Sequence, residues 1–239
     1  PAGQPLVGRR MAARLDLLDL RAESLIAQGD LDRAGADAAT MLDIASAAKS
    51  AALRAQAQNR QTLVQMRKGE LKAAVATATA ALKSARQSKK TLLVAMSLFR
   101  LAEAQNRDKP GEQVVRNATQ AAELFRASGD ASRQGRALWV VAMARSHQGR
   151  AAEGNQAAND ALTLCRSCGD LYGAGNALNM LIFHEADFAI ALKVSSLALA
   201  DFEAAGYVER QGVVTANLGI TYGGLGLHRR ARRLYLKAS

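Results

Sequence analysis

The sequence predicts an all-α protein, a solenoid of about six antiparallel helix pairs, and three observations support this fold class. Small residues recur in register along the 239-residue chain. Turn signals separate helix-like segments, and only three prolines occur, at Pro1, Pro5 and Pro110. Runs that alternate Val, Ile and Thr with polar residues are absent, so essentially no sheet is expected. Repeats of this length indicate helix pairs that bury their apolar faces against their neighbours.

Three columns of mostly small residues carry the repeat, and a single register relates them. Successive members lie 40 residues apart, except for one interval of 37 residues between the fourth and fifth units. Because three columns keep this spacing across six units, the abundance of alanine alone does not account for them. The columns are Ala34, Ala74, Val114, Gly154, Ala191 and Ala231; Ala38, Ala78, Ala118, Ala158, Ser195 and Tyr235; and Met41, Ala81, Ala121, Ala161, Ala198 and Ala238.

The spacing divides the chain into a short lead-in and six repeat units. Residues 1–10 are expected to be irregular, and residues 11–239 to form one continuous solenoid. We expect the six units to span residues 11–48, 49–88, 89–128, 129–168, 169–205 and 206–239.

In the first three units, a turn signal separates each helix-like segment from its partner. Unit one turns at Gly29, and Asp30 is placed to cap the second helix. Unit two turns at Gly69. Unit three turns at residues 108–111, where Pro110 suits the first turn of the helix that follows.

The last three units differ in how they turn. Unit four turns at Gly149, whereas unit five is three residues short and has no glycine in its turn over residues 184–187. In unit six, glycines cluster over residues 223–226, where a helix should end. Small residues at Gly219, Ala198 and Ala231 are expected where helix backbones cross closely.

The repeat is clearest in residues 217–238, which read NLGITYGGLGLHRRARRLYLKA. Its first helix carries a Leu-Gly-x-x-Tyr pattern, and its second carries alanine, aromatic and alanine at spacings of four and three. The residues are Leu218, Gly219, Tyr222, Ala231, Tyr235 and Ala238. This pattern resembles the tetratricopeptide (TPR) repeat family. The resemblance covers residues 11–239 and is closest to the long, roughly 40-residue units of multidomain bacterial signalling proteins.

The TPR resemblance implies a right-handed TPR-like solenoid whose concave face, lined by the first helices, binds a peptide or a protein segment. It implies no enzymatic activity and no cofactor. Arginine and tryptophan are favoured at binding hot spots, and methionine gives an adaptable contact. Carrying the family's groove positions onto this register predicts a binding face made by Arg60, Arg100, Arg107, Arg136, Trp139, Met143, Asn176, Met180 and Asn217. A second interpretation stays open, in which Trp139 and the methionines pack between units.

The charge of the chain bears on its partner. The formal net charge is +11, which favours acidic partners, although a basic surface also serves solubility alone. We therefore expect a protein or an acidic peptide as partner, within a larger signalling or regulatory protein. The alternative is a basic helical-repeat RNA-binding protein, which the 4% aromatic content disfavours. No apolar run is long enough to span a membrane, and no signal pattern begins the chain, so we expect a cytoplasmic location.

Few residues of the sequence are candidates for catalysis, metal binding or redox activity. Cys165 and Cys168 form a lone C-x-x-C without a preceding strand, which favours two reduced thiols over a metal or redox site. The three histidines, His147, His184 and His228, have no acidic partner at an orienting spacing, and no hydrolase, metalloprotease or phosphate-loop motif occurs. Catalytic residues, metal ligands and cofactors are therefore not expected.

Two features of the last unit, a run of arginines and exposed apolar residues, predict interactions of its own. Residues 228–233 contain four arginines, which form either an anion-binding patch or an ordinary solvated face. No polar capping helix follows the last unit in this sequence, so its outer apolar residues, near Leu234 and Leu236, are expected to be exposed. Because large exposed apolar patches are rare on monomers, we expect self-association through this unit.

Overall fold

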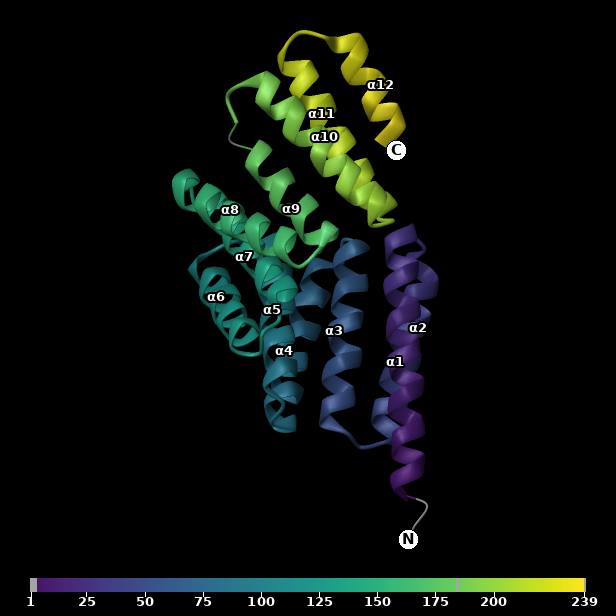
Figure 1. Cartoon of the computed structure of the whole chain (residues 1–239). Coiled ribbons are helices and arrows are strands. Elements are labelled where there is room, and N and C mark those ends of the chain that lie inside the picture. The colour runs from purple at the N-terminus through teal and green to yellow at the C-terminus, as the bar shows by residue number, and fades with distance from the viewer. Residues whose placement is uncertain (1–3, 184, 239) are drawn as a thin grey trace. The chain divides into compact units, whose positions relative to one another are not determined.

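The computed structural model describes residues 4–183 and 185–238, with the side chains of residues 4–8 left out, and these residues form helices and turns without a strand (Figure 1). This confirms the all-α fold class and the succession of helix pairs. The helices are α1 (Gln4–Gln28), α2 (Leu31–Ala47), α3 (Ala51–Arg67), α4 (Leu71–Ser88), α5 (Thr91–Asp108), α6 (Glu112–Ala127), α7 (Ala131–His147), α8 (Ala151–Ser167), α9 (Leu171–Ile182), α10 (Phe188–Ala204), α11 (Val208–Gly224) and α12 (His228–Ala238).

The start of the chain differs from the sequence prediction. We expected residues 1–10 to be irregular, but α1 begins at Gln4 and residues 4–10 are already helical. Residues 1–3 lie outside the described part of the chain. The proline at position 5 is compatible with this start, because the first turn of a helix needs no N–H donor there.

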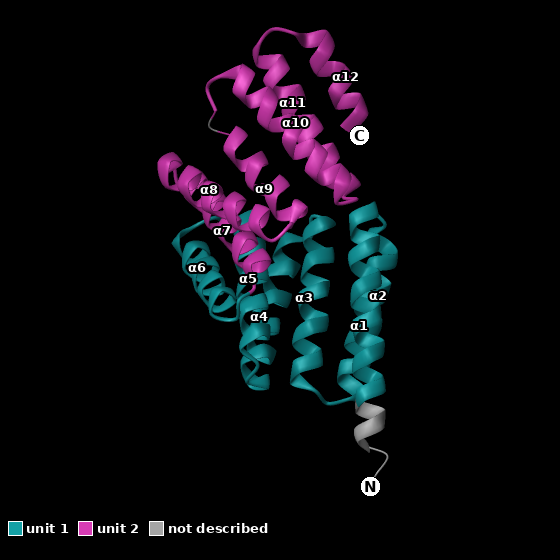
Figure 2. Ribbon diagram, viewed as in Figure 1, with its two compact units in different colours: residues 1–129 teal, residues 130–239 magenta. Residues whose placement is uncertain are grey.

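The chain divides into two compact units, residues 1–129 and residues 130–239 (Figure 2). The first contains α1 to α6 and the second α7 to α12, so that each holds three helix pairs. Within the first unit each helix packs on the next, and the first helices α1, α3 and α5 also contact one another in order. The prediction of one continuous array over residues 11–239 stays a prediction.

The turns within pairs follow the predicted signals. Gly29 and Gly149 have φ of +85° and +74°, a region that costs other residues energy because of their Cβ. Asp30 caps α2, and its carboxylate accepts a hydrogen bond from the backbone N–H of Arg33 at 3.2 Å. The turn predicted for unit five is described from Glu185 onward, and His184 lies outside the described residues.

The three residue columns form the packed interior of the helix pairs. Every member of the first column is buried, from Ala34 in α2 to Ala231 in α12. The other two columns are buried in the first five repeats, and they change only in α12, where Tyr235 is 44% exposed and Ala238 half-buried. Small side chains at these positions let the second helix of each pair approach its neighbours closely. The predicted register is therefore confirmed for the second helices, which carry all three columns.

Glycines inside helices mark the closest crossings. A Cβ added to Gly219 would lie 2.8 Å from Cε1 of Tyr235, so α11 and α12 meet at this glycine. A Cβ on Gly154, in the first column, would lie 3.1 Å from the backbone oxygen of Ala142. Both distances are shorter than ordinary van der Waals contact, which explains why glycine occupies these two helical positions despite its cost in a helix.

Candidate functional site

The first predicted site residue, Arg60 of α3, is neutralised inside the first unit. Its Nε donates to Oδ1 of Asp19 at 2.6 Å, and its Nη1 pairs with Glu23, both on α1. The Arg60 side chain is only 10% exposed. Burial by itself lowers the pKa of Arg60, but the carboxylates of Glu23 and Asp19 outweigh it and raise that pKa. This guanidinium therefore joins α3 to α1, and its charge is already compensated.

Arg100 and Arg107 of α5 are compensated by one buried acid of the same helix. Nη1 of Arg100 donates to Glu103 at 2.8 Å, and Nη2 of Arg107 lies 3.7 Å from the other Glu103 oxygen. The Glu103 side chain is 1% exposed, and burying a carboxylate is costly unless cations pair with it. Arg100 also lies over the ring of Phe99, at 4.9 Å from its centroid. Neither arginine is an isolated charge awaiting a partner.

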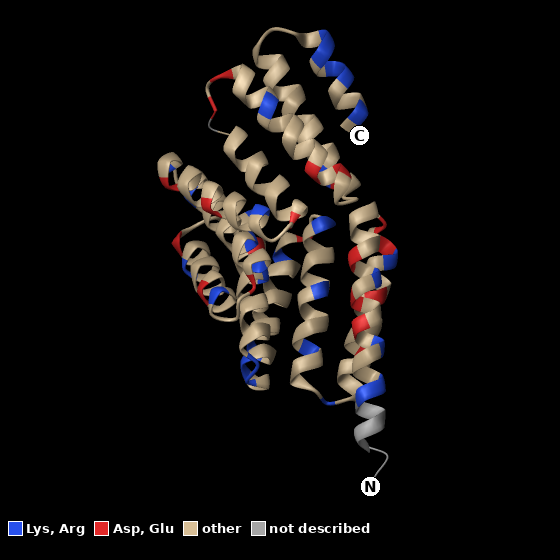
Figure 3. Ribbon diagram, in the orientation of Figure 1, with Lys and Arg blue, Asp and Glu red and all other residues tan. Residues whose placement is uncertain are grey.

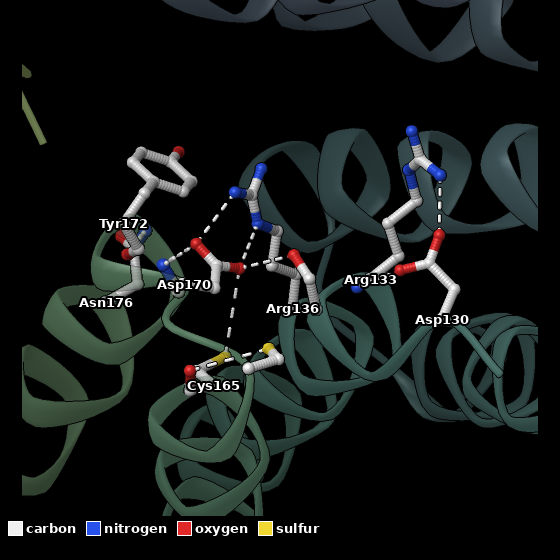
Figure 4. Close-up of polar contacts among 10 residues, drawn as sticks. Asp130, Arg133, Arg136, Cys165, Asp170, Tyr172 and Asn176 are labelled. Atoms are coloured by element: carbon white, nitrogen blue, oxygen red, sulfur yellow. Dashed lines mark hydrogen bonds and ion pairs between the residues drawn. The ribbon is translucent and has the colours of Figure 1, made fainter.

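Arg136 of α7 holds the beginning of α9 in the second unit (Figure 4). Its Nε and Nη2 donate to the two oxygens of Asp170, at 2.6 and 2.8 Å, in a bidentate pair. Asp170 is the N-cap of α9, accepts the backbone N–H of Gly173 at 2.9 Å, and accepts the hydroxyl of Ser132 at 2.7 Å. Burial raises the pKa of Asp170, but these donors outweigh it and hold that pKa below its ordinary value.

Trp139 is packed in the interior of the second unit, which corrects its assignment as an exposed anchor. Its side chain is 5% exposed, and the guanidinium of Arg210 from α11 lies 5.8 Å from its ring centroid. Arg210 also lies over Tyr172 of α9, at 5.9 Å, so α11 places a cation against aromatic rings of α7 and α9. The interpretation that stayed open in the sequence, in which Trp139 packs inside the array, is the correct one.

The remaining predicted residues of α7 and α9 are also drawn inward. Asn176 is buried and donates its Nδ2 to the backbone oxygen of Tyr172 at 2.9 Å. Met180 is buried as well, and Met143 is half-buried. Among the nine predicted residues, Asn217 of α11 lies in an open cavity, described below. Apart from Trp139, direct contact of the predicted residues with a partner stays a prediction, Asn217 included.

The cysteines behave as two free thiols. Cys165 is fully buried, and burial, followed by the negative charge of Asp170, raises the pKa of its thiol to about 12. Cys168 is exposed at the end of α8. In the described part of the chain, His, Cys, Asp and Glu side chains form no cluster of three that could hold a metal ion. The same residues include no helix with the length and hydropathy to cross a bilayer.

The open groove of the second unit lies between the first helices α9 and α11. It has a volume of about 220 Å³ and is lined by Asn179, Ile182, Phe183, Asn217, Ile220 and Thr221. Phe183 and Ile220 are 68% and 63% exposed, so the groove is apolar and accessible. Nδ2 of Asn217 donates to Oδ1 of Asn179 at 2.9 Å, which joins the two helices by a pair of amide side chains.

The short fifth repeat explains why the groove is open. α9 ends at Ile182 after 12 residues, whereas α7 and α11 each have 17. Thirteen residues after the N-cap, where α11 has the exposed Ile220, α3 and α5 have the buried Leu63 and Glu103. At the same position α7 has the half-buried Met143 and α9 has the exposed Phe183. Because α9 lacks its last turn, the corresponding stretch of α11 stays uncovered. The interval of 37 residues is visible in the sequence, but it does not say which side chains become exposed, so it does not predict Asn179 and Phe183 as groove residues.

The fold and the groove define an all-α helical-repeat protein, and comparisons with known proteins agree with this class. No family model and no curated protein matches the chain. Among solved structures, the apo form of RapI has a TM-score of 0.75 at 12% identity, over 95% of this chain and 83% of that one. A Rap protein complexed with competence and sporulation factor has a TM-score of 0.73 at 14% identity, over 97% and 76%.

A third solved structure, BtubC (BKLC) from P. vanneervenii, has a TM-score of 0.56 at 16% identity, over 97% of this chain and 89% of that one. At these identities the likeness shows a shared fold, the array of helix pairs.

Proposed function

We propose that this chain is a non-enzymatic protein-interaction module of the TPR type, which binds an extended peptide or protein segment in the groove between α9 and α11. The observation that carries the proposal is the exposure of Phe183 and Ile220 beside the Asn179–Asn217 amide pair. Ligand sites are typically apolar concavities with a few placed polar groups, and this groove has that composition.

The apolar residues of the groove supply affinity. A partner side chain that covers Ile220 or Phe183 removes a large apolar surface from water, and full burial of such a side chain contributes about 1.5–3 kcal/mol. Exposed ion pairs contribute only about 0–1 kcal/mol each. Phe183 and Ile220 are therefore expected to contribute most of the binding free energy. The sequence prediction had given that role to Trp139, which is buried.

The amide side chains of Asn179 and Asn217 are expected to orient a bound peptide. Their mutual hydrogen bond uses one N–H of Asn217 and the oxygen of Asn179. The amide oxygen of Asn217 and the amide N–H groups of Asn179 remain available, since a carboxamide offers two donors and one acceptor oxygen. An extended peptide presents backbone C=O and N–H groups that match this combination. The solved Rap protein in complex with competence and sporulation factor supports a peptide or protein as the partner class.

Peptide selection tests this proposal. A library of random linear peptides is selected against the 239-residue chain, and the binders are measured against Ile220→Glu and Asn217→Ala. Ile220→Glu places a charge on the apolar floor and is expected to weaken binding by about tenfold or more. Leu197→Glu is the matched control, because Leu197 is an exposed residue of α10 that does not line the groove.

Comparison of Ile220→Glu with Leu197→Glu decides whether the selected peptides bind in the groove. Binding that survives Leu197→Glu but is lost in Ile220→Glu supports the groove. Peptides that bind all three variants as they bind the wild type would show that the site lies elsewhere, and a failure to select any peptide would contradict a linear peptide as partner.

A further inference from the structure

The charge of the chain is concentrated in its last helix pair. Glu209 is the last acidic residue in the sequence, and the residues that follow it carry six cations. Five of them belong to α12, which therefore has arginine and lysine but no acid (Figure 3). The six are Arg210, Arg229, Arg230, Arg232, Arg233 and Lys237.

Three of these cations surround a cavity between α11 and α12. The cavity has a volume of about 330 Å³ and is lined by Tyr222, Arg230, Arg233, Leu234 and Lys237. Arg230 lies over the ring of Tyr222, at 5.8 Å from its centroid. Tyr222 and Leu234 are half-buried and form an apolar floor, whereas the three cations are exposed at the rim.

These rim cations differ from the arginines of the first helices in having no carboxylate. Arg60, Arg100 and Arg136 are each paired with an acid of their own unit. By contrast, none of the ion pairs among the described side chains involves a residue of α12. Guanidinium and ammonium groups are donors only, so acceptors have to come from water or from a partner. The position of the uncompensated charge thus predicts where an anion binds.

We propose that the cavity between α11 and α12 binds an acidic protein segment, with its carboxylates on Arg230, Arg233 and Lys237 and an apolar side chain on Tyr222 and Leu234. Charge complementarity carries the choice of partner, because a carboxylate matches the forked donors of arginine. This surface is separate from the groove between α9 and α11 and does not depend on a ligand there.

Two other polyanions fit the cavity less well. A membrane surface requires an apolar stripe on the same helix, but the residues three and four positions before the exposed Leu236 are Arg233 and Arg232. A single-stranded nucleic acid requires free aromatic faces on which bases stack, and the ring of Tyr222 lies beneath Arg230. An acidic segment needs neither.

A binding assay with a defined probe tests the inference. The probe is a short fluorescein-labelled peptide of glutamate and aspartate residues around one leucine, and its anisotropy is followed with the full chain at low and high salt. Arg230→Gln/Arg233→Gln is expected to weaken binding about tenfold, since each exposed pair contributes up to about fivefold. Salt is expected to weaken wild-type binding and to affect this variant less.

A second double variant has the same total charge as Arg230→Gln/Arg233→Gln and serves as its control. Arg229→Gln/Arg232→Gln removes the same charge from the same helix, at residues that do not line the cavity, and is expected to weaken binding less than about threefold. Arg230→Lys/Arg233→Lys, which keeps the charge, is expected to restore most of the affinity. Circular dichroism of each variant confirms that the helices are retained.

Three results would overturn the inference. Equal weakening by the two glutamine pairs would show that charge on α12 acts diffusely, without a site. Tighter binding of a single-stranded RNA of equal charge, or of vesicles rich in phosphatidylserine, would assign the surface to another partner. Loss of probe binding in Asn217→Ala would place the acidic segment in the groove between α9 and α11, so the two proposals fail separately.

Discussion

At the scale of single residues, the arginines of the first helices serve the interior of the protein. Arg60 joins α3 to α1 through Asp19 and Glu23, and Arg136 joins α7 to the start of α9 through Asp170. Burying a charge is costly unless it is paired and hydrogen-bonded, so each arginine needs its acid and each acid its arginine. An acidic partner would have to compete with these internal carboxylates.

Replacing Arg136 by methionine is expected to destabilise the second unit by about 2–3 kcal/mol at neutral pH. The change leaves the buried carboxylate of Asp170 without its bidentate partner, and the partial exposure of Arg136 keeps the loss below that of a fully buried pair. Urea denaturation followed by circular dichroism measures the difference. The control is Arg133→Met, because Arg133 pairs with Asp130 in a more exposed position of the same helix.

The pH dependence of this difference has a definite sign. In the wild type the pKa of Asp170 is lowered, so the pair contributes stability above the ordinary carboxyl pKa of 3.8 and loses it as the pH falls further. In Arg136→Met, burial is no longer outweighed, and the pKa of Asp170 rises. The stability difference between the two proteins should therefore be largest at neutral pH and shrink as the pH falls towards 4 and below. A difference that is constant with pH would contradict the role of this ion pair.

At the scale of the helices, the columns of small residues determine how closely neighbours pack. Ala198 of α10 is fully buried in a cluster with Leu178, Phe202 and Val214. Protein interiors are packed nearly as tightly as crystals, so extra side-chain volume forces shifts in the neighbours. The register of the repeat therefore also identifies positions at which a larger side chain lowers the stability of the fold.

Ala198→Leu is expected to destabilise the chain by about 1–3 kcal/mol through overpacking of this cluster. Ala200 lies two residues further along α10 and is exposed, so Ala200→Leu is the matched control with little expected effect. The midpoint and slope of urea denaturation measure both variants. An unchanged midpoint in Ala198→Leu would be incompatible with close packing at this column.

At the scale of the whole molecule, the last helix pair exposes several apolar side chains, one of them at a repeat position that is buried elsewhere. Tyr235 is exposed at a column position that is buried in the five earlier repeats. Ile220 and Leu236 are exposed as well. These side chains support the sequence prediction of self-association, which stays a prediction.

We expect the chain to self-associate at high concentration through α11 and α12, and Tyr235→Glu to weaken that association. Contact between apolar side chains removes them from water, whereas a glutamate at the interface would have to be buried without a partner. Sedimentation velocity over a concentration series measures the effect, with Leu197→Glu as a control for added charge on an exposed apolar residue. A chain that remains monomeric at every concentration would refute this expectation.

The sequence by itself determined the architecture. Turn glycines, helix caps and three columns of small residues are local or periodic signals. They were sufficient to predict an all-α protein with six helix pairs and the register of the second helices. Ala198 was also placed correctly, because a column position meets an equivalent neighbour in each repeat, and Gly219 was placed by the Leu-Gly pattern of the last unit.

Only the tertiary structure decided what is exposed. Periodicity shows which helix face a residue occupies, but it does not show which acid lies opposite Arg60 or Arg136. Nor does it show that Arg210 of α11 lies over Trp139 of α7, four helices earlier in the chain. The sequence contained the three-residue shortening of the fifth repeat, yet the groove that results depends on where α9 ends against α11. Exposure is a property of packed neighbours, and for this reason the proposed binding surface emerged from the fold rather than from the motif.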